Sequence, residues 1–227
     1  MKVFGRNVFN ELKNDIKSIK KVYIANSFSD REIIDFVKKN NISHQFMDIK
    51  KMDGMVDGRH QGIIIVINEY EYVDYETMLD DKIVVMLDHL EDPHNFGAII
   101  RTCEAAGIKS IIIPKDRSVS VNGTVMKTSA GALEYVNIAM VSNLVNVIKD
   151  FKKNGFFAYA ADMGGENYKN IDFNDKVLLI IGNEGNGIAR LVRDNCDQII
   201  AIPQYGNINS LNASVAAAIL IYGIVNK

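Results

Sequence analysis

The sequence has few of the residues that build disulfide scaffolds, metal centres and rigid turns. Its 227 residues include two cysteines, four histidines, three prolines and no tryptophan. Two cysteines, Cys103 and Cys196, are too few for a disulfide framework or a Cys-rich zinc site, and they fit a reducing compartment. The histidines form no HxxxH or HxH pair, so we expect no metal centre.

Long apolar stretches are also missing. No apolar run reaches the roughly 18–20 residues of a transmembrane helix, and the first residues lack the apolar core of a signal peptide. We therefore expect a cytoplasmic protein with no membrane partner. Hydrophobic residues make up 48% of the chain and charged residues 24%. This composition is ordinary for a folded protein and excludes a disordered or fibrous chain.

The net charge of −2 and the isoelectric point of about 6.1 do not suggest a globally basic nucleic-acid binder. The distribution of charge is uneven. Residues 1–60 contain 12 Lys and Arg against 8 Asp and Glu, whereas the remaining chain contains 14 against 20. Two interpretations stay open from charge alone: two solvated surfaces, or a first segment that meets a polyanion while the second does something else.

Residues 1–68 predict a small α/β unit without proline. Segments predicted to be helical alternate with apolar runs that favour β-strands. One helix is predicted to start at Ser29, which acts as N-cap with Glu32 three residues on. The apolar residues at helical spacing are Val8, Leu12, Ile16 and Ile19. The strand candidates are residues 21–25, 44–49 and 63–67. Residues 69–81 are acidic and aromatic without strong periodicity, and we interpret them as a linker.

Residues 82–227 predict a parallel sheet, because strand-like and helical segments alternate. The strand candidates are residues 83–87, 108–113, 136–140, 156–160, 177–181 and 198–202. The last stretch, from Ser210 onward, has small and then large apolar residues, which is typical of a tightly packed C-terminal helix.

The segment 88–101 follows a buried strand, so it lies at the carboxyl end of the sheet, where ligands bind in open α/β folds. Arg101 lies about 140° from Phe96 around a helix, away from one apolar face. That face comprises Phe96, Ile99, Ile100 and Cys103. A purely structural interpretation remains open, with Asn95 as the helix N-cap and Arg101 as a solvated charge. For Cys103, a buried inert thiol is favoured over a redox role.

Two further segments follow strands. Gly182–Gly187 is glycine-rich, which lets a backbone turn sharply and approach a ligand, but it is neither a Walker A loop nor GxGxxG. A plain strand-to-helix turn would explain its glycines, although not Glu184. Residues 202–212 concentrate Gly, Asn and Ser before the last helix, of which Ser210 could be the N-cap.

Together, these motifs closely resemble the SpoU (TrmH-type) family of RNA ribose 2′-O-methyltransferases, within the SPOUT superfamily. The resemblance rests on their order: Asp92–Gly97 with Arg101, Gly182–Gly185 with Gly187, and Ile202–Pro203 with Ser210–Asn212. Three further segments resemble the branch that methylates a guanosine in 23S rRNA: Pro114–Ser118, Lys127–Glu134 and His60–Ile63.

The resemblance implies an N-terminal ribosomal-protein-like domain that binds RNA substrate and a C-terminal SPOUT domain, residues 82–227, with a deep trefoil knot. It implies S-adenosyl-L-methionine as cofactor and a homodimer acting on a guanosine ribose in the peptidyl-transferase P-loop of 23S rRNA, free or in an assembling large subunit. The implied catalytic residues are Asn95, Arg101, Glu184, Ser210 and Asn212. The implied cofactor-binding residues are Gly182, Ile202 and Leu211. The candidate RNA-binding residues are Arg6, Arg59, His60, Arg117 and Lys127.

Physical chemistry limits the role of Arg101, because a guanidinium is very hard to deprotonate. A phosphate clamp, or stabilisation of alkoxide charge, fits Arg101 better than general-base catalysis. Two alternatives remain beside the rRNA enzyme: the same methyl transfer to tRNA or another RNA, and a non-catalytic RNA-binding scaffold. A nicotinamide dehydrogenase is weaker, because its glycine fingerprint and acidic ribose partner are missing.

Overall fold

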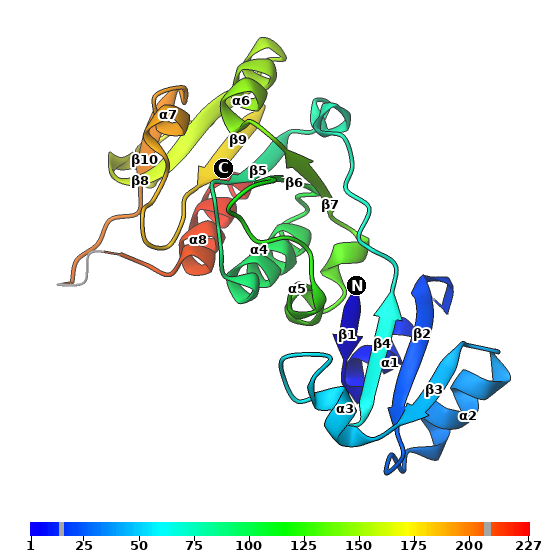
Figure 1. The fold of residues 1–227 in the computed structure, drawn as a ribbon. Helices are drawn as coiled ribbons and strands as arrows, with labels where there is room; N and C mark the ends of the chain where they lie inside the picture. The colour runs from blue at the N-terminus through cyan, green and yellow to red at the C-terminus, as the bar shows by residue number, and fades with distance from the viewer. Residues whose placement is uncertain (14–15, 207–209) are drawn as a thin grey trace. The chain divides into compact units, whose positions relative to one another are not determined.

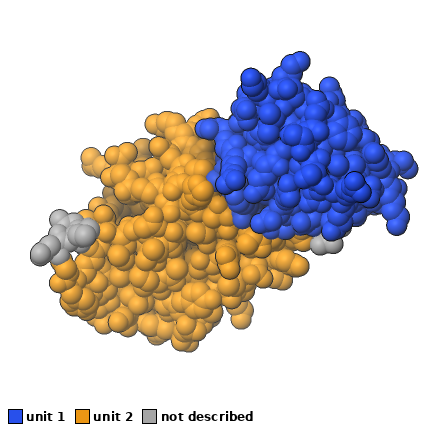
Figure 2. Space-filling view, turned by 90° about the horizontal axis from the view of Figure 1, so that it is seen from below, with its two compact units in different colours: residues 1–71, 121–127 blue, residues 72–120, 128–227 orange. Residues whose placement is uncertain are grey.

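The computed structural model describes residues 1–13, 16–206 and 210–227, which form two compact units (Figure 2). Unit 1 comprises residues 1–71 and 121–127, and unit 2 comprises residues 72–120 and 128–227. Within the described ranges, no helix is long and apolar enough to cross a membrane.

Unit 1 is built on a four-stranded sheet (Figure 1). From one edge to the other, its strands are β1 (Lys2–Phe4), β4 (Ile63–Ile67), β2 (Ile19–Ala25) and β3 (His44–Met47). β4 runs antiparallel to both β1 and β2, whereas β2 and β3 are parallel. The three predicted strands of this unit are confirmed. The short edge strand β1 was not predicted, because three residues carry too little periodicity to identify a strand.

Short helices accompany this sheet: α1 (Arg6–Leu12), the 3-10 turn η1 (Ile16–Ser18), α2 (Arg31–Lys39) and α3 (Ile49–Asp53). Two predictions are wrong here. The helical spacing was extended to Ile19, which instead begins β2, because the helix ends at Leu12. The N-cap of α2 is Asp30 rather than Ser29, since the Asp30 carboxylate accepts the Ile33 N–H at 3.3 Å.

Unit 2 contains a six-stranded, wholly parallel sheet, as predicted. Its strands, in spatial order, are β10 (Gln198–Ala201), β8 (Phe157–Asn167), β9 (Val177–Ile181), β5 (Ile83–Leu87), β6 (Ser110–Pro114) and β7 (Asn137–Val141). The central strand β9 is buried at every position, which explains its uninterrupted apolar sequence. All six predicted strands are therefore present; five have small shifts at their ends or none, whereas β8, predicted as 156–160, extends to Asn167.

Helices cover both faces of this sheet, with α4 and α8 packed together on one face and α6 and α7 on the other (Figure 1). The helices of unit 2 are α4 (Pro93–Ala105), α6 (Leu144–Lys153), α7 (Arg190–Arg193) and α8 (Ala213–Val225), with 3-10 turns η2 (Tyr75–Met78), η3 (Ala132–Glu134) and η4 (Tyr168–Asn170). The segment α5 (Gly123–Ser129) passes from unit 1 into unit 2. The trefoil knot implied by the resemblance stays a prediction.

Candidate functional site

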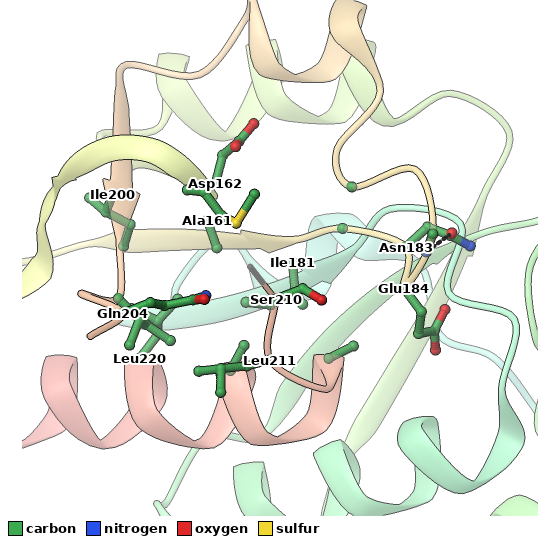
Figure 3. A pocket seen from close by; sticks show the side chains of 17 residues that line it. Ala161, Asp162, Ile181, Asn183, Glu184, Ile200, Gln204, Ser210, Leu211 and Leu220 are labelled. Atoms are coloured by element: carbon green, nitrogen blue, oxygen red, sulfur yellow. Dashed lines mark hydrogen bonds between the residues drawn. The ribbon is translucent and has the colours of Figure 1, made fainter. Parts of the chain in front are cut away.

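A cavity of about 230 Å³ lies at the carboxyl ends of β9 and β10, beside the middle of β8 and the N-terminal part of α8 (Figure 3). An irregularity in β8 creates part of its wall. The pairing of β10 with β8 jumps from Ala160 to Glu166 between two successive residues of β10. Residues 161–165 therefore leave this ladder, and Ala161, Asp162 and Met163 line the cavity. Figure 3 shows Ile200, Gln204 and Leu220 toward one end and Asn183 and Glu184 toward the other.

The glycine-rich loop after β9 forms a tight turn at the second end of this cavity. Asn183 and Gly187 exchange two backbone hydrogen bonds of 3.0 Å, and Gly187 has a φ of 65°. A Cβ atom on Gly182 would lie 2.4 Å from the Gly187 carbonyl carbon and 2.5 Å from the Ile188 nitrogen. Since those neighbours are backbone atoms, the closed loop leaves no space for a side chain at Gly182.

The Asn183 side chain holds the loop from inside. Its Oδ1 accepts the Gly185 and Asn186 N–H groups at 2.8 and 3.1 Å, and its Nδ2 donates to the His89 carbonyl at 2.7 Å. The adjacent Asp88 is 1% exposed, and its carboxylate accepts the Ala189 N–H at 2.6 Å and contacts His89 Nδ1 at 2.5 Å. The loops after β5 and β9 are therefore tied together.

Three polar side chains form a chain of hydrogen bonds beside the cavity. Asn212 is the N-cap of α8, because its Oδ1 accepts the N–H groups of Ser214 and Val215 at 2.9 and 3.3 Å. Its Nδ2 therefore faces Asn95 and donates to Asn95 Oδ1 at 3.0 Å. This contact leaves Asn95 Nδ2 to donate to Glu184 Oε1 at 2.9 Å. The N-cap thus orients the Glu184 carboxylate through Asn95.

These contacts decide between the interpretations of two segments. The N-cap of α4 is Asp92, whose carboxylate accepts the His94 N–H at 2.8 Å, and Asn95 is 6% exposed inside the helix. The interpretation of Asn95 as an N-cap is therefore wrong. The interpretation of Ser210 as the N-cap of the last helix is also wrong, because Asn212 occupies that position. The segment 202–212 includes residues 207–209, which lie outside the described residues.

The structure brings some of the expected catalytic and cofactor residues together but not all. Gly182, Ile202 and Leu211 line the cavity, as do Glu184 and Ser210. Asn95 donates a hydrogen bond to Glu184, and Asn212 is linked to Glu184 through Asn95. Arg101 lies two turns along α4 from Asn95, is exposed, and forms no hydrogen bond or ion pair with any residue that the structure describes. Its guanidinium is therefore available to a ligand.

The apolar face predicted for α4 is confirmed, since Phe96, Ile99, Ile100 and Cys103 are all fully buried. Burial raises the pKa of the Cys103 thiol to about 12. Burial, helped by the nearby charge of Asp197, likewise raises the pKa of Cys196 to about 12. Both thiols are thus protonated at neutral pH, which agrees with the inert thiol expected at Cys103.

The candidate RNA-binding residues differ in availability. Arg59, Arg117 and Lys127 are exposed. Arg6 is engaged, since its guanidinium lies 3.7 Å from Asp30 and stacks over Phe28. His60 is 4% exposed; its Nδ1 accepts the Gly62 N–H at 3.0 Å, so Nε2 carries the hydrogen and donates to Asp53 at 2.9 Å. The His60 ring therefore holds the turn next to Arg59.

Sequence reasoning did not assign roles to three residues of the site. Asp162 lines the cavity because residues 161–165 leave the pairing of β8 with β10, and the local amino-acid pattern does not predict this change of register. Asn183 shapes the loop, and Asp88 ties it to the neighbouring strand. A polar residue at the end of each buried strand was a usable signal for these last two, since carboxyl ends of parallel strands carry ligand sites.

Comparison with known proteins agrees with this arrangement. Residues 82–222 match the SpoU rRNA Methylase family, and residues 2–73 match the RNA 2′-O ribose methyltransferase substrate binding family. The Bacillus subtilis protein named "Putative TrmH family tRNA/rRNA methyltransferase YacO" is 38% identical over 99% of this chain and 95% of its own.

Solved structures share the fold. The SpoU methyltransferase AviRb of Streptomyces viridochromogenes, in complex with S-adenosylmethionine, has a TM-score of 0.81 at 21% identity and covers all of this chain and 89% of its own. An S-adenosylmethionine-bound rRNA methyltransferase of Sinorhizobium meliloti has a TM-score of 0.74 at 21% identity, covering 98% of this chain and 85% of its own. The A. aeolicus TrmH/SpoU tRNA modifying enzyme has a TM-score of 0.59 at 30% identity and covers 65% of this chain and 75% of its own. The protein belongs to the SpoU/TrmH family of RNA methyltransferases.

Proposed function

We propose that the protein transfers the methyl group of S-adenosyl-L-methionine to the 2′-hydroxyl of a guanosine ribose in 23S rRNA. The observation that carries the proposal is the Asn212–Asn95–Glu184 chain of hydrogen bonds at the rim of the cavity. It fixes the orientation of the Glu184 carboxylate, which we assign as the proton acceptor for the ribose hydroxyl, and such positioning is the main task in an in-line methyl transfer. An inactive RNA-binding scaffold has no need to hold Glu184 in this way.

The residues of the cavity suit S-adenosylmethionine. Ile181, Ile200 and Leu220 offer apolar walls for an adenine ring. The carboxylate of Glu184, and that of Asp162, which also contacts Arg193 at 3.0 Å, suit a ligand with a sulfonium and an ammonium group. Gly182, Ile202 and Leu211 would hold it through their backbones. When bound, S-adenosylmethionine supplies the electrophilic methyl group. The solved relatives that contain it share this fold.

Glu184 is the proposed proton acceptor. Its carboxylate is exposed on the cavity side, and Asn95 fixes one oxygen at 2.9 Å, which leaves the other oxygen for the ribose hydroxyl. Arg101 would clamp the phosphate beside the target ribose or stabilise the alkoxide charge, because a guanidinium remains protonated. Ser210, on the cavity wall, would orient the nucleotide through its hydroxyl.

Unit 1 supports an rRNA substrate over tRNA. It matches a substrate-binding family, and the rRNA methyltransferase of S. meliloti covers 98% of this chain, whereas the tRNA modifying enzyme of A. aeolicus covers 65%. We propose that Arg59, Arg117 and Lys127 contact the RNA, Arg59 and Lys127 through its phosphates, and that Arg6 and His60 shape the surface around Arg59. We also propose a homodimer, supported by the exposed apolar residues Val215, Tyr222 and Val225 of α8.

The test is to incubate the protein with labelled S-adenosylmethionine and either a 23S rRNA transcript of the peptidyl-transferase region or a tRNA pool. The proposal predicts label in the rRNA alone, as 2′-O-methylguanosine. Label in tRNA alone would keep the chemistry and overturn the substrate. Label in neither RNA nor an assembling large subunit would overturn the proposal, and the absence of cofactor binding by calorimetry would then favour the scaffold.

A further inference from the structure

We propose that a second cavity in unit 2 binds the guanine base of the nucleotide that is modified, and that Glu91 and Arg117 recognise it. This inference rests on the function proposed above. The cavity has a volume of about 280 Å³, and its walls include His89, Glu91, Arg117, Asn183, Asn186 and Gly187. Neither Glu91 nor the cavity has a part in the mechanism described so far.

The position of this cavity suits the base of the reacting nucleotide. Its walls come from the loops after β9, β5 and β6, three adjacent strands of the parallel sheet, at the carboxyl ends where ligands bind. Asn183 and Gly187 line this cavity and the first one as well, so the loop that carries Glu184 forms a wall of both. A ribose at Glu184 therefore has its attached base within reach of the second cavity.

The backbone around this cavity is strained and held in place. His89 and Arg117 both adopt left-handed φ values, 56° and 52°, which non-glycine residues rarely adopt and which concentrate at ligand sites. The carbonyl of Leu90, between His89 and Glu91, accepts hydrogen bonds from the Ser118 hydroxyl at 3.1 Å and the Val119 N–H at 2.7 Å. The segments that carry Glu91 and Arg117 are thus joined directly to each other.

The two charged side chains are free to meet a ligand. Glu91 and Arg117 are exposed, line the same cavity, and form no ion pair or hydrogen bond with each other or with any other residue in the described ranges. Opposite charges left unpaired in one cavity match a ligand that is an acceptor on one edge and a donor on another.

Guanine has this pattern among the bases. A guanidinium donates in bidentate fashion to guanine O6 and N7, and a carboxylate accepts from the guanine N1–H and the N2 amino group. Adenine keeps N7 but places an amino donor where guanine has O6, so it loses the bidentate contact with Arg117; it also lacks the N1–H and N2 amino donors that Glu91 would accept. The cavity therefore selects guanine by the charges of Glu91 and Arg117.

The test compares rRNA carrying guanosine or inosine at the modified position, because inosine lacks only the N2 amino group. A hydrogen bond to a charged group makes the expected fall in kcat/KM with inosine about 10- to 100-fold for the wild-type protein. In Glu91→Ala the guanosine substrate should slow by a similar factor, and the discrimination between the two substrates should fall to about one. Glu104→Ala, an equal charge change at an exposed position of α4, is the matched control and should keep full discrimination.

A second pair of substrates tests Arg117. Replacement of guanine by 7-deazaguanine removes N7, and Arg117→Ala should abolish the penalty that this change imposes on the wild-type protein. Equal rates with guanosine and inosine in the wild type, or undiminished discrimination in Glu91→Ala, would overturn the inference while the proposed methyl transfer stands. Methylation of a nucleotide other than guanosine would also overturn it. Failure of the wild-type protein to methylate any RNA would instead refute the proposed function and this inference with it.

Discussion

The substitution Asn95→Asp changes one atom of the chain that orients Glu184. Asn95 Nδ2 lies 2.9 Å from Glu184 Oε1, so the substitution places two carboxylate oxygens at that separation while the contact with Asn212 can persist. Two unit charges 4 Å apart repel by about 1 kcal/mol in water and about 4 kcal/mol at the effective dielectric constant of a protein surface. Because Glu184 is exposed, the lower part of this range applies. A cost of about 1–2 kcal/mol corresponds to a rate about 5- to 30-fold lower.

The sign of the pH dependence distinguishes repulsion from general damage. Repulsion favours the protonated form and therefore raises the pKa of the carboxyl pair in the variant above the ordinary value. Below that raised pKa, the bound proton replaces the lost N–H, and the geometry of Glu184 is restored. The ratio of variant to wild-type rate should thus be lowest at high pH and rise as the pH falls.

Single-turnover methyl transfer, measured for both proteins at each pH, provides this ratio. Asn95→Ala serves as one control. Its ratio of variant to wild-type rate should lie below one and should not change with pH. Asn137→Asp, the same charge change at an exposed position of β7, should behave as the wild type. A ratio near one at every pH, or a ratio that falls as the pH falls, would refute the role of Asn95 in orienting Glu184.

Three other predictions follow from single contacts. Gly182→Ala should weaken S-adenosylmethionine binding about 5- to 150-fold by calorimetry, because overpacking of about 1–3 kcal/mol must open the loop. Gly164→Ala, whose Cβ meets nothing within 4 Å, should bind normally, and equal affinities of the two variants would contradict this reasoning. Arg101→Ala should abolish turnover and spare cofactor binding, whereas Arg190→Ala, at an exposed arginine of α7, should retain turnover; near-normal methylation by the first variant would remove Arg101 from the mechanism. Because the pKa values of Cys103 and Cys196 are raised to about 12, a thiol reagent should react slowly with the native protein at about pH 8 and quickly after unfolding. A thiol that reacts fast in the native protein would contradict the burial of these two side chains.

Strands with continuous apolar sequences were predictable, because burial on both faces leaves a pattern that the sequence alone displays. The strand β9, Val177–Ile181, has the predicted bounds for this reason. Local breaks were not predictable. The strand β8 was expected to end at Ala160, but it continues to Asn167, and its pairing with β10 resumes at Glu166 after residues 161–165 leave the ladder. This arrangement depends on the neighbouring strand rather than on local propensity.

The candidate site shows the same division. The residues Asn95, Glu184 and Asn212 were identified through motifs, yet the sequence did not show that they form one chain of hydrogen bonds. Helix caps were the weakest predictions, because several cap-forming residues stand close together before each helix. At α2 the predicted cap was Ser29 and the observed cap is Asp30; at α8 the candidate was Ser210 and the observed cap is Asn212. The cap hydrogen bonds of the folded helix, rather than residue type, decide between such neighbours.

The most direct test of the central claim is to locate the transferred methyl group. Wild-type protein is incubated with labelled S-adenosylmethionine and the 23S rRNA transcript, and the RNA is then digested and analysed by nucleoside mass spectrometry. A second transcript carries a 2′-deoxynucleotide at the modified position. The account predicts a methyl group on the ribose 2′-oxygen of a guanosine and no transfer to the deoxy transcript. A methyl group on a base, or equal transfer to the deoxy transcript, would contradict it.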